Sequence, residues 1–167
     1  GIGLETSFTG EDSLAATIDI GDTGSVVGGS DGLNFDGTSN ALNLDGLTYT
    51  FPVGGVTVMV GDSTDISAVY TGACAYSSFT DYMGNCGTGN SVGVGGNGVT
   101  AAASYAFDSG FSLAGGVSST QITDAGVVPG LLTEAGADVY GIEAAYTADS
   151  YGLAVAYSDN ELSLIHI

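Results

Sequence analysis

Residues that could carry out chemistry are few in this sequence, and carboxylates dominate them. The 167 residues include nineteen Asp and Glu, two Cys and one His, whereas Lys and Arg are absent and the formal net charge is -19. The single histidine, His166, lies in a terminal hexapeptide of different composition, so no Cys-His pair or Ser-His-Asp triad can be assembled. No carboxylate pair stands out for acid-base catalysis. We therefore expect that the protein is not an enzyme and uses no cofactor.

Cys74 and Cys86 are the only cysteines, with eleven residues between them in a stretch rich in turn formers. A disulfide between them would close one loop and stabilise the fold by about 3 kcal/mol in chain-entropy terms. Such bonds persist in oxidising compartments such as a periplasm or a cell surface. A pair of free thiols is the alternative. Two cysteines without a nearby histidine do not complete a tetrahedral zinc site, so we expect no bound metal.

The charge balance also excludes whole classes of partner. Nucleic-acid binding requires cationic side chains that neutralise phosphates, and this chain has none. Soluble proteins intersperse both signs of charge over their surface, yet here 44% of residues are hydrophobic and the mean hydropathy is +0.32. The sequence has no apolar run of the roughly 20 residues that a membrane helix needs. Any contact with lipid must therefore come from strands.

Two stretches with a period of two predict β-hairpins. In residues 101–117, bulky side chains share one face on both sides of an Asp-Ser-Gly turn, and residues 143–157 repeat that arrangement. The alternate positions are small or weakly polar, unlike the surface of a soluble sandwich. Aromatic residues flank both tight turns: Tyr105, Phe107, Phe111, Tyr146 and Tyr151. Because a bilayer interface favours rings at strand ends, we expect these five at the membrane–water interface, with packing in a sandwich core as the alternative.

The rest of the chain follows the same plan. Residues 2–20 and 47–60 alternate in the same way, and the longer stretches 21–40, about 71–98 and 118–137 are rich in Gly, Asp, Asn and Ser. Short turns on one side and long loops on the other are typical of outer-membrane barrels. We therefore predict an all-β fold, an antiparallel meander of about eight strands that forms part of a transmembrane β-barrel and is an open sheet in isolation. Porin barrels with open channels need roughly sixteen strands or more.

The alternation places three carboxylates, those of Glu5, Asp19 and Glu143, on the face opposite the large apolar residues. They are our pore-lining candidates. Carboxylates on a low-dielectric wall concentrate cations and repel anions, so we expect a preference for cations. The alternative is that they are hydrated wall residues without a measurable effect on selectivity.

A second function fits the acidity of the chain. The segment 28–37 reads Gly-Gly-Ser-Asp-Gly-Leu-Asn-Phe-Asp-Gly and loosely resembles a calcium-binding nonapeptide repeat. It favours a secreted, acidic, calcium-binding adhesin or surface-layer β-module, whose carboxylates would coordinate the cation. The cluster occurs once, however, and the hairpins recur at a much longer spacing. A soluble β-sandwich is the third alternative.

Two segments carry a resemblance to a known family. Leu4-Glu-Thr-Ser-Phe-Thr-Gly-Glu-Asp-Ser-Leu14 and Leu47-Thr-Tyr-Thr-Phe-Pro-Val-Gly54 are similar to the LxTSFTGxDxL and LxYxFPxG segments of cyanobacterial outer-membrane porins, which are related to carbohydrate-selective, OprB-like porins. Their order and separation also fit, and the resemblance spans about residues 1–161. One departure is that Ala15, Ala16 and Thr17 stand where such porins often have arginines.

The resemblance implies an outer-membrane location and passive diffusion of small hydrophilic solutes or inorganic ions, including iron. It also implies lipid as a partner, the homotrimer that many porins form, and a wall-binding domain and a coiled coil ahead of Gly1. We accordingly expect an internal fragment in which residues 1–161 are a partial porin barrel domain. Residues 162–167 match a translated sequencing adapter, so we expect a non-native tail there, with a genuine terminal strand as the alternative.

Overall fold

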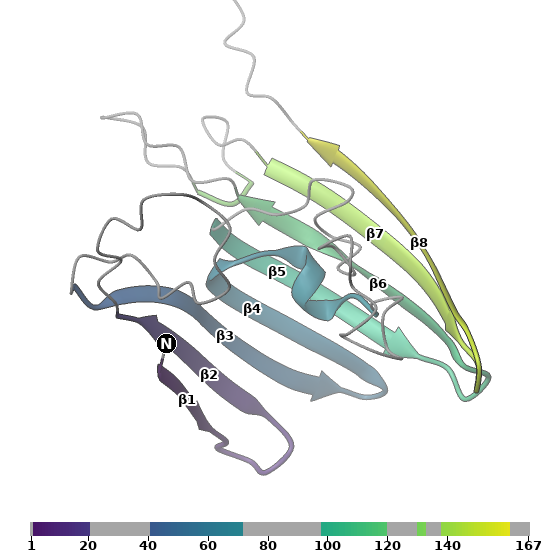
Figure 1. The fold of residues 1–167 in the computed structure, drawn as a ribbon, viewed down its shortest axis with the longest axis horizontal. Coiled ribbons are helices and arrows are strands. Elements are labelled where there is room, and N and C mark those ends of the chain that lie inside the picture. Colours follow the sequence, from purple (N-terminus) through teal and green to yellow (C-terminus); the bar gives the residue numbers. More distant parts are fainter. Residues whose placement is uncertain (1, 21–40, 72–97, 120–129, 133–137, 161–167) are drawn as a thin grey trace, which may run out of the picture.

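The computed structural model describes residues 2–20, 41–71, 98–119, 130–132 and 138–160, and these residues form one sheet of eight strands with one short 3-10 helix. The helix, η1, spans Ile66–Val69. Every strand is antiparallel to the next one along the chain, so the sheet is a meander with β1 and β8 at its edges (Figure 1). The strands are β1 (Ile2–Thr6), β2 (Ser13–Asp19), β3 (Asn43–Val53), β4 (Val56–Thr64), β5 (Gly98–Ala106), β6 (Phe111–Ser119), β7 (Asp138–Thr147) and β8 (Gly152–Asn160). The predicted all-β meander of about eight strands is confirmed, and the sheet is open.

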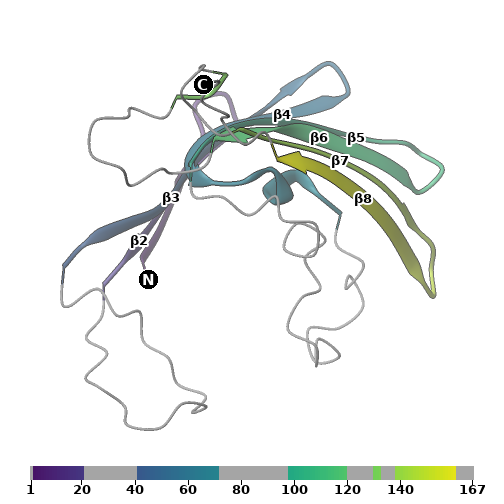
Figure 2. The ribbon, with the colours of Figure 1, turned by 90° about the horizontal axis from the view of Figure 1, so that it is seen from above.

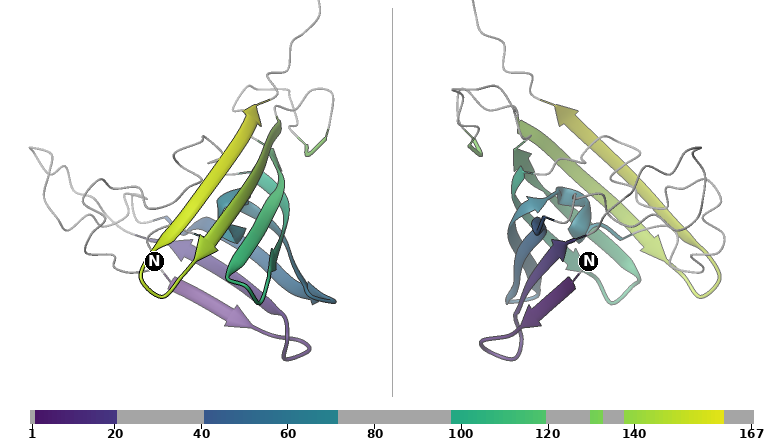
Figure 3. Two further views of the ribbon diagram at one scale, coloured as in Figure 1. Left: turned by 90° about the vertical axis from the view of Figure 1, so that its right-hand side faces the viewer. Right: turned by 60° about the vertical axis from the view of Figure 1, so that its left-hand side comes forward.

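The sheet is a single curved layer with two unlike faces. It bends into a trough, and η1 lies inside the trough (Figures 2 and 3). We call the side that η1 covers the concave face and the opposite side the convex face. Met59 of β4, Ala102 of β5 and Val139 of β7 pack with Ile66 of η1, which identifies them as concave-face residues. Every second residue along a strand shares their side, except where the register shifts in β3 and β4.

Strand register keeps the two faces separate across the whole sheet. On the convex face, Phe111 pairs with Tyr146 and Leu113 pairs with Ala144, whereas the neighbouring concave-face pair is Ala114 with Glu143. In β3, Asp45 is an extra residue with no pairing partner in β2, and beyond this β-bulge the two faces stay separate. A second register shift lies between Gly61 and Thr64 of β4. A slip of one residue in any pair would exchange the faces of a strand.

Four tight turns join the strand pairs β1–β2, β3–β4, β5–β6 and β7–β8 at the same end of the sheet (Figure 1). Gly54 and Gly110 adopt φ angles of +62° and +87° in two of these turns, a backbone conformation that glycine reaches without a steric penalty. The Phe107 amide donates to the Phe111 carbonyl at 2.8 Å, and the Ala148 amide donates to the Tyr151 carbonyl at 2.9 Å. These hydrogen bonds close the β5–β6 and β7–β8 hairpins locally.

Because β5 and β6 pack closely at Gly116, a larger residue there should destabilise the sheet. A Cβ at Gly116, on the concave face, would lie 2.5 Å from the Ala101 carbonyl oxygen and 2.7 Å from the Ala102 Cβ, whereas a Cβ at Gly3 of β1 meets nothing within 4 Å. We expect Gly116→Val to destabilise the fold by about 1–3 kcal/mol because the strand must shift. Gly3→Val should leave stability unchanged or slightly raised. Chemical unfolding in detergent micelles, followed by far-UV circular dichroism, measures both, and equal stability of the two variants contradicts the packing.

Candidate functional site

Bulky apolar side chains stand uncovered on the convex face. Ile142, Leu153 and Val155 expose 63%, 63% and 74% of their surface. No second layer of the described residues packs on them, although burial of such side chains is the main driving force of folding in water. From the tight-turn end to the margin formed by Asp62 and Asp159, the convex positions of β4–β8 carry no ionisable group other than tyrosine. These positions form a continuous apolar band, which we call the convex band.

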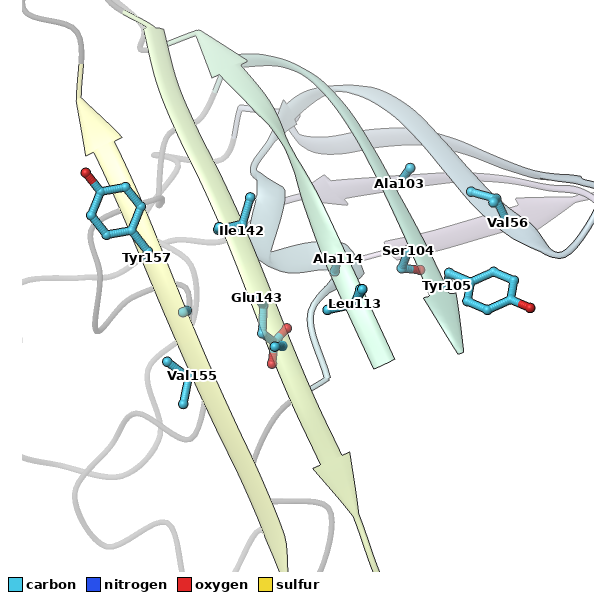
Figure 4. Close-up of a pocket in the computed structure, with 12 residues that line it drawn as sticks. Val56, Ala103, Ser104, Tyr105, Leu113, Ala114, Ile142, Glu143, Val155 and Tyr157 are labelled. Carbon is cyan, nitrogen blue, oxygen red and sulfur yellow. The ribbon is translucent and has the colours of Figure 1, made fainter. Parts of the chain in front are cut away.

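The band includes one shallow depression, of about 540 Å³, that runs across β4–β8 (Figure 4). Large side chains form its sides, and small residues such as Ala103 and Ala144 lie between them. The large side chains are Val56, Tyr105, Leu113, Ile142, Val155 and Tyr157. Ser104 and Glu143 also line the depression, but its surface is mostly apolar and open, so it offers contact to hydrocarbon more than to a hydrophilic ligand.

The five aromatic residues singled out from the sequence lie together at the tight-turn end. The ring centroids of Tyr105 and Phe107 are 4.6 Å apart, as are those of Phe111 and Tyr146. Tyr151 continues the row, 6.1 Å from Tyr146. These separations are those of favourable edge-on or tilted ring pairs.

The aromatic row extends further than the sequence analysis expected. Phe8 and Tyr49 meet at 6.1 Å, and Tyr49 stacks on Phe51 at 5.3 Å, beside the β1–β2 and β3–β4 turns. Rings therefore border all four tight turns. Their alternation and their proximity to turn glycines were the signals in the sequence that could have identified them.

The β1–β2 turn is organised by one carboxylate, that of Asp12. Its Oδ1 accepts the amides of Phe8 at 3.0 Å and Thr9 at 2.7 Å. The hydroxyl groups of Ser7 and Thr9 also donate to Oδ1, at 2.7 Å and 2.6 Å. Hydrogen bonds from Thr9, then from Ser7, hold the pKa of Asp12 well below its usual range because they favour the ionised form.

The same carboxylate joins the two segments that carry the family resemblance. The Tyr49 hydroxyl, from the second segment, donates to Asp12 Oδ2 at 2.8 Å. Together with the contact between the Phe8 and Tyr49 rings, this bond ties the β1–β2 turn to the next hairpin. Both segments are turn-building elements at one end of the sheet.

The concave face carries small and hydroxylated residues together with the predicted carboxylates. Glu5 lies on exposed β1 and accepts a hydrogen bond from the Ser13 hydroxyl at 2.7 Å. Asp19 is half-buried at the end of β2, opposite Asn43. Glu143 lies on β7, where only 3% of its surface is exposed. All three occupy the face that the alternation predicted, but they lie on different strands and do not form one cluster.

A short segment folds back over this face. Residues 65–71, which we call the inward segment, include η1, and its Ile66 is fully buried against Met59, Ala102 and Val139. Asp65 caps the start of η1 by accepting the Ser67 amide at 2.7 Å. The sequence pattern does not predict this segment, because it indicates a hairpin at 47–60 and a loop at about 71–98, with nothing assigned between them.

The inward segment ends against Glu143. The Thr71 amide donates to Glu143 Oε2 at 2.8 Å, and the hydroxyl oxygens of Thr71 and Ser112 are 3.0 Å apart. Burial, followed by the negative charges of Glu143 and Asp65, raises the pKa of Tyr70 to about 12, so Tyr70 stays protonated at neutral pH. Glu143 thus contacts the segment that covers it.

Beside the inward segment lies a polar depression of about 350 Å³. Hydroxyl groups from β2, β3 and β4 line it together with the carboxylates of Asp45 and Asp65. Asp45 reaches this side through the β-bulge, which cannot be read from the alternation. Among the described residues, no group of three or more His, Cys, Asp or Glu side chains is arranged to hold a metal ion.

Three features of the sequence lie outside the described residues. They are the disulfide predicted between Cys74 and Cys86, the calcium-repeat-like segment 28–37, and the tail 162–167 with His166. Each stays a prediction. In the part of the chain that the structure describes, no helix has the length and the apolar character to cross a membrane. Comparisons with protein-family models, with curated proteins and with solved structures gave no match.

The depressed pKa of Asp12 predicts an acid-dependent contribution to stability. This carboxyl titrates near 3.8 when unperturbed, so its ionised form stabilises the fold above about pH 4, and the contribution is lost as the pH falls toward the lower folded pKa. Asp12→Asn should lower the denaturation midpoint at pH 7, and its difference from the wild type should shrink at pH 3. Glu11→Gln, the neighbouring exposed acid, is the control and should change neither value. A pH-independent difference for Asp12→Asn contradicts this role.

Proposed function

We propose that this chain forms part of the wall of an outer-membrane porin, a passive diffusion channel for small hydrophilic solutes or inorganic ions that prefers cations. The observation that carries the proposal is the contrast between the two faces of a one-layer sheet. The convex face exposes large apolar side chains, and the concave face carries small, hydroxylated and acidic ones. A barrel wall in lipid needs this arrangement, with hydrocarbon outside and water inside.

The strand dimensions support a membrane-spanning wall. Strands β3 to β8 contain 9 to 11 residues each, and a tilted strand needs about 9–11 residues to cross the hydrocarbon layer. In this proposal the aromatic row at the tight turns lies at one interface, and Asp62 and Asp159 lie near the other. Because lipid cannot satisfy the edges of a sheet, β1 and β8 would pair with further strands of the barrel.

Two soluble alternatives fit the sheet less well. A β-sandwich would bury the bulky face against a second sheet, and the described residues contain one sheet only. For the calcium-binding adhesin, the segment that suggested calcium binding lies outside the described residues, and the described carboxylates form no metal-binding group. Neither alternative accounts for the exposed convex band.

Preference for cations follows from the charges available to the channel. Asp45 and Asp65 border the polar depression, Glu5 and Asp19 lie on the same face, and the chain has no Lys or Arg to offset them. A wall of one charge sign raises the local concentration of its counter-ions.

Insertion into lipid should depend on which face receives a charge. Val155→Arg places a guanidinium on the convex face and should lower the stability of the lipid-inserted sheet by about 2–4 kcal/mol. Ala154→Arg is the matched control, because the adjacent residue faces the trough at nearly the same depth. Urea titration of vesicle-bound protein, followed by circular dichroism, measures both. Equal losses for the two variants, or a wild type that stays folded without detergent and is stabilised by calcium, would favour a soluble module.

Channel selectivity tests the function itself. In planar bilayers, the closed barrel that contains this sheet should give a reversal potential in a KCl gradient that reports a preference for K⁺ over Cl⁻. Combining Glu5→Gln with Asp19→Asn should reduce that preference, whereas Asp108→Asn, in an exposed tight turn, should not. Anion preference, or an absence of channels, would overturn the proposal.

A further inference from the structure

We infer that Glu143 is a positioning residue. Its buried carboxylate fastens the inward segment to the concave face and so sets the width of the proposed channel. This inference rests on the proposed function for its effect on solutes, but the fastening itself is a property of the fold. It differs from the role that the sequence suggests for Glu143, which is to face the permeating ion.

Burial argues against a direct role of Glu143 in selecting ions. Only 3% of its surface is exposed, and Oε2 accepts the Thr71 amide at 2.8 Å. A carboxylate under a polypeptide segment does not touch a solute that passes over that segment. The electrostatic field of Glu143 reaches the channel only through the residues that cover it. Other acids of the concave face are less buried, namely Glu5, Asp19, Asp45 and Asp65.

The inward segment is fastened at two points, and Glu143 forms the second. At the start, the Thr100 hydroxyl donates to the Thr64 carbonyl at 2.9 Å, and Ile66 fills an apolar pocket. At the end, apolar contacts give way to hydrogen bonds, from Thr71 to Glu143 and between Thr71 and Ser112. Loss of the second point would leave the segment held only by the packing of Ile66, Val69 and Tyr70 on the apolar cluster, with Thr71 unfastened.

The local sequence makes room for this contact. The residues paired with Glu143 on the neighbouring strands are Ala114 and Ala156, so no large side chain competes for the space above β7. Tyr70 adopts an extended conformation, with φ −79° and ψ 147°, and thereby directs the chain from η1 to Thr71. A hydrogen bond to a charged acceptor in such a desolvated position is stronger than one between neutral groups.

Two substitutions at Glu143 separate positioning from ion selection. Glu143→Gln keeps an oxygen that can accept the Thr71 amide, so positioning predicts little change in conductance or in the K⁺ to Cl⁻ preference. Glu143→Ala removes the acceptor, so the segment should move into the trough and the open-channel current noise should rise. If Glu143 instead selects ions directly, both variants should lose the preference for K⁺ over Cl⁻, because both remove its negative charge.

Hydrogen exchange at the Thr71 amide directly measures how well its hydrogen bond to Glu143 protects it. In the closed barrel in lipid nanodiscs, Glu143→Ala should speed exchange at Thr71 by about ten- to a hundredfold, the equivalent of one hydrogen bond to a charged group. Glu143→Gln should change it much less, and exchange at Ala102 within β5 should stay constant. Glu5→Ala, at another carboxylate of the concave face, is the matched control and should leave Thr71 unchanged.

A second variant keeps the test decisive if Glu143→Ala does not fold. Thr71→Pro removes the donor from the segment and leaves β7 intact, and the extended Tyr70 is compatible with a following proline. It should raise the current noise as Glu143→Ala does. Unchanged noise in Thr71→Pro, or equal exchange at Thr71 in wild type and Glu143→Ala, overturns the positioning role. If no variant conducts ions, the porin proposal fails, and exchange at Thr71 still decides whether Glu143 fastens the segment.

Discussion

The alternation of side chains in a single uncovered layer is the constraint on which the rest of this structure depends. Antiparallel pairing brings side chains of one face together across seven strand pairs, so one error of register would place leucine and tyrosine in the trough and threonine outside. The β-bulge at Asp45 shows that the sheet absorbs an extra residue without losing this separation. The proposed barrel wall depends on this consistency of the two faces more than on any single contact.

The small residues of the concave face make the inward segment possible. Gly116 allows β5 and β6 to pack where a Cβ would clash, and Ala102 leaves space in which Ile66 is buried. Larger residues at these positions would fill the trough with side chains, as in small closed barrels. Here the backbone of the inward segment fills part of the trough. Its amides can donate hydrogen bonds to polar side chains of the concave face. The composition, rich in Gly and Ala, therefore serves the interior of the trough as well as the turns.

Much of the fold could be predicted from the sequence because its main signal is local. A period of two and Gly-containing turns suffice to predict the hairpins at 101–117 and 143–157, and alternation assigns Glu143 to the correct face. The inward segment could not be predicted, because Ile66 is held by residues from three distant strands. The same limit applies to Asp45, whose side depends on the bulge, and to the burial of Glu143, which depends on Thr71.

The absence of Lys and Arg requires another way to stabilise buried acids, and the structure provides one. The buried acidic residues in the described part of the chain are Asp12, Asp138 and Glu143. Each accepts an amide of a turn, a loop or the inward segment: Asp12 from Thr9, Asp138 from Leu132 at 2.9 Å, and Glu143 from Thr71. Backbone amides thus act where other proteins use cationic side chains, although Asp138 Oδ1 is buried without a hydrogen bond from any described residue. A chain built in this way ties its connections to its strands while leaving every permanent charge on the trough negative.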